Sequence, residues 1–159
     1  MPPKIDFKRE LACYSAGRNR PQVVDVPDLR YLMIDGHGDP NTPAYEAAVS
    51  ALYPVAYTLK FASRDILGRD YVVMPLEGLW WADDMGTFTA ARDKSRWDWT
   101  LMTMVPDWIT AEAFDEAVGG LRAGQPPERL ADVRLQSLAE GRCVQALHVG
   151  AYDDEAELL

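Results

Sequence analysis

The chain contains few of the residues that build disulfide frameworks and zinc sites. Its 159 residues include only two cysteines and two histidines: Cys13, Cys143, His37 and His148. The cysteines lie far apart and form no C-x-x-C spacing, which favours two reduced thiols in a cytosolic protein. Two isolated histidines are too few for a zinc site. The sequence therefore predicts that no metal is bound.

Long hydrophobic runs and cofactor fingerprints are missing as well. No apolar run approaches the roughly 18 residues that a membrane helix needs, and the polar N-terminus lacks the apolar core of a signal peptide. There is no G-x-S-x-G nucleophile motif, no P-loop and no dinucleotide fingerprint. We therefore expect a soluble, cytoplasmic protein without a cofactor.

Positive charge is the scarcer sign. Lysine and arginine number 16 against 25 aspartates and glutamates, which gives a net charge of -9. Such a field repels phosphate backbones and anionic membranes, so neither a nucleic acid nor a membrane surface is an expected partner. A neutral or cationic amphipathic ligand is favoured instead. With 48% hydrophobic residues, the chain is expected to form one globular domain.

One sequence pattern occurs twice. Residues Tyr31–Pro40 and Val144–Asp154 each combine an apolar run, a glycine (Gly36, Gly150) and an acidic helix start. Repetition in fixed order predicts a duplicated strand–helix–strand–strand module, of which the second copy stops at Leu159. We therefore expect the natural protein to continue for about 40–60 residues, by analogy with the first copy, or to pair with a neighbour. In either case residues 145–149 should present an open edge or a partner surface.

Periodicity and turn residues predict the elements. They are an N-terminal arm (1–21), strands at 23–27, 29–35, 70–77 and 97–105, a helix from 41 or 42 to 63 that starts at Pro43 and bends near Pro54, a helix at 111–122 capped by Thr110, a hairpin of 133–138 with 145–149, and a helix start at 153–159. Gly78 is expected to permit a bulge. The predicted fold class is α+β, an antiparallel sheet with helices on one face. Within the single domain 1–159, the first module covers 22–106, a connecting helix and linker 107–130, and the start of the second module 131–159.

The strongest candidate site is a cluster of tryptophans beside an acid. Four of the five tryptophans fall between residues 80 and 99, and Glu77 lies just before Trp80 and Trp81. Consecutive residues of a strand face opposite ways, so one of these two indoles should leave the core. Indole faces attract cations, and a carboxylate among them has a perturbed pKa or a cationic partner. The competing interpretation is ordinary core packing.

A second aromatic row follows the long helix. Tyr53, Tyr57 and Phe61 are spaced by four residues and would complete an aromatic box if they face the tryptophans; the alternative is again packing.

Several motifs together resemble the GyrI-like small-molecule-binding family, in its stand-alone bacterial branch. They are Lys-Ile-Asp-Phe-Lys, Val-Val-Asp-Val-Pro, Leu-Met-Ile-Asp-Gly-His-Gly-Asp-Pro, Ala-Leu-Tyr-Pro-Val-Ala-Tyr-Thr-Leu-Lys-Phe, Val-Met-Pro-Leu-Glu-Gly-Leu-Trp-Trp and Leu-His-Val-Gly-Ala-Tyr-Asp-Asp-Glu. The resemblance implies two modules that enclose one ligand cleft. It also implies a relation to cyclopropanoid cyclopropyl hydrolases, which use water to open the strained ring of DNA-alkylating compounds. In that family aromatic side chains hold the drug and a glutamate assists the attack.

The chain departs from the family pattern in three ways. It has no helix-turn-helix, it carries Pro54 where a small residue is usual, and it ends before the segment that would supply the principal acid, which we expect beyond Leu159. Glu77 is the counterpart of that acid in the first module. It is therefore a candidate, and the catalytic group stays unassigned.

We predict binding of a hydrophobic aromatic or cationic small molecule, with hydrolytic ring-opening as a further activity. The predicted ligand-binding residues are Tyr53, Tyr57, Phe61, Met74, Glu77, Trp80, Trp81 and Trp99. One alternative is a protein-interaction module of the topoisomerase-inhibitor kind, with a protein partner or a homodimer. The other is an effector domain without its DNA-binding partner.

Overall fold

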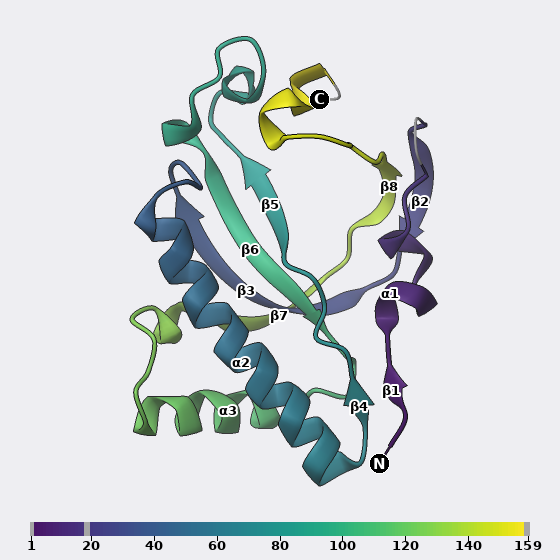
Figure 1. The fold of residues 1–159 in the computed structure, drawn as a ribbon, viewed down its shortest axis with the longest axis vertical. Coiled ribbons are helices and arrows are strands. Elements are labelled where there is room, and N and C mark those ends of the chain that lie inside the picture. The colour runs from purple at the N-terminus through teal and green to yellow at the C-terminus, as the bar shows by residue number, and fades with distance from the viewer. Residues whose placement is uncertain (1, 18–19, 158–159) are drawn as a thin grey trace.

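A four-stranded antiparallel sheet forms the centre of the computed structural model, which describes residues 2–17 and 20–157 (Figure 1). The strand order is β5 (Glu77–Trp81), β6 (Asp98–Val105), β3 (Leu29–His37) and β7 (Arg134–Leu138). Two further pairs are β2 (Gln22–Val26) with β8 (Gly141–Gln145), which is antiparallel, and β1 (Lys4–Ile5) with β4 (Asp70–Tyr71), which is parallel. The α-helices are α1 (Phe7–Glu10), α2 (Pro43–Leu67) and α3 (Ala111–Ala123), and the 3-10 turns are η1 (Ala12–Tyr14), η2 (Met85–Phe88), η3 (Lys94–Arg96), η4 (Leu130–Asp132) and η5 (Tyr152–Glu157). The predicted α+β class is confirmed.

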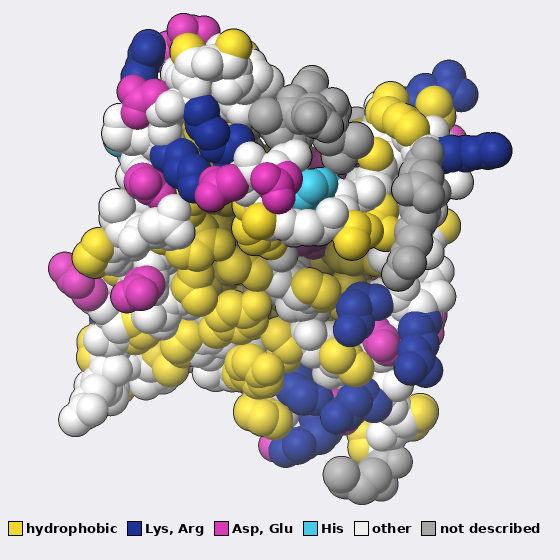
Figure 2. Space-filling model, turned by 45° about the horizontal axis from the view of Figure 1, so that its top comes forward, with side chains coloured by type: hydrophobic (Ala, Val, Ile, Leu, Met, Phe, Trp, Pro, Cys, Tyr) yellow, Lys and Arg dark blue, Asp and Glu magenta, His cyan; other side chains and the backbone are white. Residues whose placement is uncertain are grey.

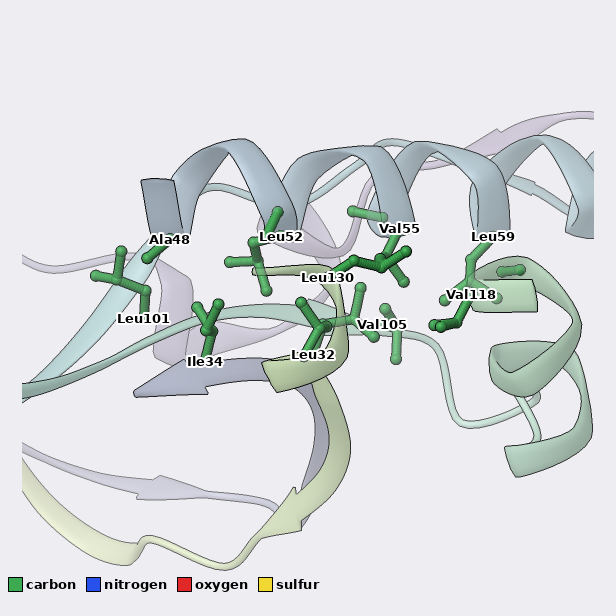
Figure 3. Close-up of a cluster of buried hydrophobic side chains, with 14 of the residues drawn as sticks. Leu32, Ile34, Ala48, Leu52, Val55, Leu59, Leu101, Val105, Val118 and Leu130 are labelled. Carbon is green, nitrogen blue, oxygen red and sulfur yellow. The ribbon is translucent and has the colours of Figure 1, made fainter. Parts of the chain in front are cut away.

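The helices α2 and α3 cover one face of the sheet. Pro43 occupies the first turn of α2, where its missing N–H costs nothing, and Gly68 ends the helix with a φ of 67°. Figure 3 shows the apolar stripe of α2 lying on side chains of β3 and β6, with Val118 of α3 beside it. The shared core includes Leu32, Ile34, Leu52, Val55, Leu59, Leu101 and Val105, all at most 2% exposed.

Neither α2 nor α3 lies on the opposite face of the sheet. The N-terminal arm, which includes the short helix α1, covers part of this face. Phe7, Leu11 and Tyr14 of the arm pack against a second buried cluster. The cluster consists of Tyr31, Met33, Met74, Met102 and Met104. We call this side of the sheet the helix-free face. The arm begins with β1, which pairs with β4 and so ties its start to the end of α2.

The predicted strand at 70–77 is wrong as a single element. The chain pairs as β4 only over Asp70–Tyr71 and again as β5 from Glu77, and Pro75 between them has no N–H to give to a ladder. The expected bulge at Gly78 is also wrong, because β5 and β6 pair without interruption from Glu77 with Met102 to Trp81 with Asp98. Gly78 instead makes room for an indole: an added Cβ would lie 2.5 Å from Nε1 of Trp80.

The predicted hairpin of 133–138 with 145–149 is wrong as well. The strand β7 pairs with β3, which lies far away in sequence. The second strand is β8, which overlaps the predicted 145–149 only at Gln145 and pairs with β2. Two smaller corrections follow. The strand expected at 29–35 continues to His37, and the described part of the last segment is a 3-10 turn, while residues 158–159 lie outside the described residues. The duplicated module and the bend at Pro54 stay predictions.

Candidate functional site

Strand alternation arranges the helix-free face in rows across the sheet. One row joins Arg134, Met33, Met102 and Glu77, the next joins Asp35, Thr100 and Leu79, and the last joins His37, Asp98 and Trp81. Along the strands, this face changes from buried methionines under the arm to charged side chains. We call the end with the row of His37, Asp98 and Trp81 the open end of the face. Glu77 sits at the boundary between these two halves.

Glu77 is held by a tyrosine of the arm. The hydroxyl of Tyr14 donates a hydrogen bond to Oε2 of Glu77 over 2.6 Å, and both side chains are partly buried. Within the described part of the chain, no other side chain is recorded as a hydrogen-bond partner of this carboxylate, so Oε1 is left to accept from water or a ligand. Glu77 is thus a partly buried acid whose neighbouring donor is an aromatic O–H.

The surroundings of Glu77 favour its protonated form. Burial raises the pKa of the carboxyl group most, the hydrogen bond from Tyr14 lowers it, and the nearby charge of Glu140 raises it again; the net shift is upward. Burial also raises the pKa of Tyr31 above its ordinary range, with the charge of Glu77 adding to the effect. A carboxyl with a raised pKa beside neutral phenols is a candidate for proton exchange with a ligand or with water.

Next to this site, Asp35 belongs to a satisfied network. Its Oδ1 accepts from the Thr100 hydroxyl over 2.6 Å, and its two oxygens each lie 3.1 Å from nitrogens of Arg134. Burial would raise the pKa of Asp35, but the hydrogen bonds from Thr100 and Arg134 outweigh it and the pKa is lowered. The paired, ionised Asp35 therefore serves to join β3, β6 and β7 rather than to carry protons.

At the open end, His37 and Asp98 form a cross-strand pair. Nδ1 of His37 lies 2.6 Å from Oδ1 of Asp98, and Trp81 is the direct neighbour of Asp98 on β5. Trp81 is 43% exposed, whereas Trp80 points to the other face. The prediction that the two consecutive indoles face opposite ways is confirmed.

The structure separates two of the three predicted ligand-binding tryptophans, Trp80 and Trp99, from Glu77, whereas Trp81 shares its face. Trp80 contacts Trp97, Trp99 and Tyr45 on the helix-covered face, and Trp99 is fully buried there. The acid and these indoles lie on opposite faces because positions 77 and 80 differ in parity along β5. The aromatic groups beside Glu77 are Tyr14 and Tyr31. Met74, also predicted, is buried in the methionine cluster on the side of Glu77.

The aromatic row of α2 lies on the outer flank of the helix. Tyr53, Tyr57 and Phe61 stack along the helix with ring centroids 6.2–6.4 Å apart, and the guanidinium of Arg64 lies 4.9 Å from the Phe61 ring. Within the described residues, the aromatic side chain of α2 that contacts the tryptophans is Tyr45 and none of these three. Figure 2 shows a broad hydrophobic area bordered by lysine and arginine side chains. Tyr53, Tyr57 and Phe61 therefore do not form the predicted aromatic box with the tryptophans.

A pocket of about 260 Å³ opens at the other end of the helix-free face. It lies between the arm, the β2–β3 bend and the end of β6, and it is lined by apolar residues such as Phe7, Leu11, Leu29 and Met104 together with Asp28 and Asp107. Glu77 is not part of its lining. We give more weight to the Glu77 site, because its carboxylate is partly buried and accepts a hydrogen bond from the Tyr14 hydroxyl.

Two kinds of site are not found in residues 2–17 and 20–157. These residues contain no cluster of three or more histidine, cysteine, aspartate or glutamate side chains that could hold a metal ion. None of their helices combines the length and the apolar character needed to cross a lipid bilayer.

Sequence reasoning missed Tyr14, Tyr31 and the His37–Asp98 pair. The Tyr14–Glu77 bond joins residues 63 positions apart, and no local pattern points to it. For Tyr31 and His37 the available signal was strand alternation. Residues 31, 33, 35 and 37 of β3 point to one face of the sheet, and the register places them on the same face as the odd-numbered residues of β5.

Comparison with known proteins relates the chain to bacterial proteins of known structure. No protein-family model and no curated protein match it. An uncharacterized conserved protein from Listeria innocua is 37% identical, with a TM-score of 0.86 over 97% of this chain and 76% of its own. Two structures of hydrolases from Listeria innocua are each 36% identical, with TM-scores of 0.85 and 0.82, and the match covers 98% and 97% of this chain and 76% and 75% of theirs.

Proposed function

Because the chain belongs to the same family as these Listeria innocua proteins, we propose that it is a hydrolase that binds flat, hydrophobic aromatic or cationic small molecules on its helix-free face. We further propose that the family is GyrI-like and that the reaction is hydrolytic ring-opening of cyclopropanoid compounds, as the sequence motifs imply. We place the protein in the bacterial cytoplasm, with a role in detoxification.

The observation that carries this proposal is the position of Glu77. An acid with a raised pKa lies at the edge of a surface made of Met33, Met102 and Met104, and one of its oxygens is fixed by Tyr14. Methionine side chains adapt to apolar ligands of different shapes, which suits a binding surface of broad specificity. The arm supplies Tyr14 and covers these methionines, so a ligand that reaches them has to displace Phe7 or Leu11.

The chemistry assigned to Glu77 is proton transfer with water. Its free Oε1 accepts a proton from the attacking water while the water oxygen bonds to the strained ring carbon. The carbon–carbon bond of the ring breaks, and its electron pair passes to the rest of the substrate, which takes up a proton. Tyr14 keeps the carboxylate oriented.

The experiment is incubation with a cyclopropanoid drug, followed by mass detection of the ring-opened product. Glu77→Gln keeps the shape and a hydrogen-bond acceptor for Tyr14, and it should lower the rate at least about tenfold while binding changes little. The matched control is Glu112→Gln on the exposed first turn of α3, which should keep the rate. Equal rates for wild type and Glu77→Gln would remove Glu77 from the chemistry, and no binding would contradict the ligand face itself.

One observation favours a second role in protein contact. The β2–β8 ribbon and the segment after it expose Val23, Val144, Leu147 and Val149, between 40% and 74% of each residue. Such an apolar patch is typical of surfaces that contact another protein or a second copy. Light scattering on wild type and Val144→Asp tests this role: loss of a dimer in the variant would support it, and a monomer in both would leave only a partner of another kind.

A further inference from the structure

The open end of the helix-free face carries a pair of groups that the proposed function does not use. His37, Asp98 and Trp81 are direct neighbours in one row across β3, β6 and β5. The His37 side chain is 64% exposed and that of Asp98 34%. Asp98 is the middle residue, so about two interstrand spacings, roughly 10 Å between Cα atoms, separate His37 from Trp81.

The hydrogen bond to Asp98 fixes which imidazole nitrogen can bind a ligand. An ionised carboxylate only accepts hydrogen bonds, so Nδ1 of His37 carries the proton that lies between the two side chains, 2.6 Å apart. In the neutral ring, Nε2 then has a free lone pair and is an acceptor. Within the described residues, Nε2 has no recorded partner. The pair therefore presents a fixed acceptor to solvent beside an exposed indole.

Other groups near this row are already engaged. Thr100 and Arg134 bind Asp35, and Leu79 packs toward the methionine cluster, so the adjacent row offers an apolar floor and a satisfied ion pair. The second histidine lies elsewhere, with Nε2 2.8 Å from the carbonyl oxygen of Ala151. Among the described residues, a ligand on Trp81 thus finds two acceptors of this row without a hydrogen-bond partner, Nε2 of His37 and Oδ2 of Asp98, and only Nε2 can change from acceptor to donor with the imidazole tautomer.

We infer that Trp81 and the His37–Asp98 pair form a binding subsite for a planar aromatic molecule with an acidic O–H or N–H, such as a phenol. The ring stacks on the Trp81 indole, and the O–H donates a hydrogen bond to Nε2 of His37. The inference rests on the proposed function only in that it names the part of the helix-free face where such a ligand first binds. Glu77 lies two rows away, and its chemistry is not needed.

The probes for this subsite are naphthol and methylnaphthalene, which differ in the hydroxyl group. Because the chain has only two histidines, each gives its own ring signal in NMR, and His148→Gln assigns them. Naphthol should shift the His37 signal and bind about three- to tenfold more tightly than methylnaphthalene, as expected for one hydrogen bond. His37→Leu should remove that preference, Trp81→Ala should weaken both probes, and His148→Gln should change neither affinity.

Asp98→Asn provides a sharper test. An asparagine amide can donate to Nδ1, which moves the ring proton to Nε2 and turns the acceptor into a donor. The variant should then bind naphthol and methoxynaphthalene about equally, because the oxygen of either probe can accept from the N–H at Nε2. Equal binding of naphthol and methylnaphthalene by the wild type, no binding of either, or an effect of His148→Gln equal to that of His37→Leu would overturn the subsite. These outcomes are independent of Glu77→Gln, whose effect on ring-opening tests the proposed function separately.

Discussion

Removing the hydroxyl of Tyr14 tests whether the arm holds Glu77 in place. Tyr14→Phe keeps the ring that packs on the methionine cluster and deletes only the donor 2.6 Å from Oε2. Hydrogen bonds to charged groups contribute about 1.5–3 kcal/mol, and partial exposure of both side chains reduces this to about 1–2 kcal/mol. With a urea m-value of about 2 kcal/mol per M, the midpoint should fall by about 0.5–1 M.

The loss should depend on pH in a defined direction. The bond to Tyr14 lowers the pKa of Glu77, so its removal raises that pKa further. The donor stabilises the carboxylate more than the protonated acid, and the destabilisation should therefore be larger at pH 7 than at pH 4. Urea titrations at both values measure this difference.

The control is Tyr57→Phe, which removes a hydroxyl from an exposed ring on the outer flank of α2. It should change the free energy of unfolding by less than about 0.5 kcal/mol. If Tyr14→Phe behaves like this control at pH 7, the Tyr14–Glu77 bond contributes nothing and the arm does not position the acid.

Three further changes probe the core, a buried ion pair and the titration of Glu77. Gly36→Ala should lower the free energy of unfolding in urea by at least about 3 kcal/mol, because the new Cβ would lie 2.0 Å from Cη2 of the fully buried Trp99. The control is Gly119→Ala, where the added methyl meets nothing within 4 Å and should stabilise α3 by about 0.5–1 kcal/mol. Lys60→Met should lower the melting temperature, because it leaves the buried Asp70 carboxylate unpaired. The double variant Lys60→Met with Asp70→Asn should recover part of this loss, and no recovery would mean that the two side chains are not coupled. The pKa of Glu77 is raised, so the contribution of this residue to stability is complete below the ordinary pKa of 4.5 and is lost as the pH rises through the raised pKa. Wild type should therefore lose stability relative to Glu77→Gln from pH 4.5 upward. A difference that stays constant with pH would contradict the shift.

The sequence predicted the elements whose signals are local. The helix α2 has its proline at the start, glycine at the end and apolar residues at helical spacing, and β6 is a continuous run of buried residues after Asp98. Thr110 caps α3 as expected, with its hydroxyl accepting from the N–H of Ala113. In these segments propensity, periodicity and capping agree, and the structure follows them.

Pairing between distant segments could not be predicted in this way. The alternation in 133–138 indicates a strand but does not name its partner, which is β3. The short spacing suggested a hairpin with 145–149, whereas the second strand lies earlier, as β8, and pairs with β2. The same limit applied to the site. Proximity along the chain associated Glu77 with Trp80, while the sheet placed it with Tyr14 and Tyr31, which no spacing rule connects to it.

The most direct test of the ligand face uses the methyl groups of the methionines. Met33, Met102 and Met104 lie on the helix-free face beside Glu77, while Met85 lies in η2 and is 58% exposed. NMR of methyl-labelled methionines during titration with a cyclopropanoid drug reports where the drug binds. The account predicts that the signals of Met33, Met102 and Met104 shift together and saturate at one affinity, with Met85 unchanged. A saturable shift confined to Met85, or binding that leaves the three face methionines unchanged, would contradict it.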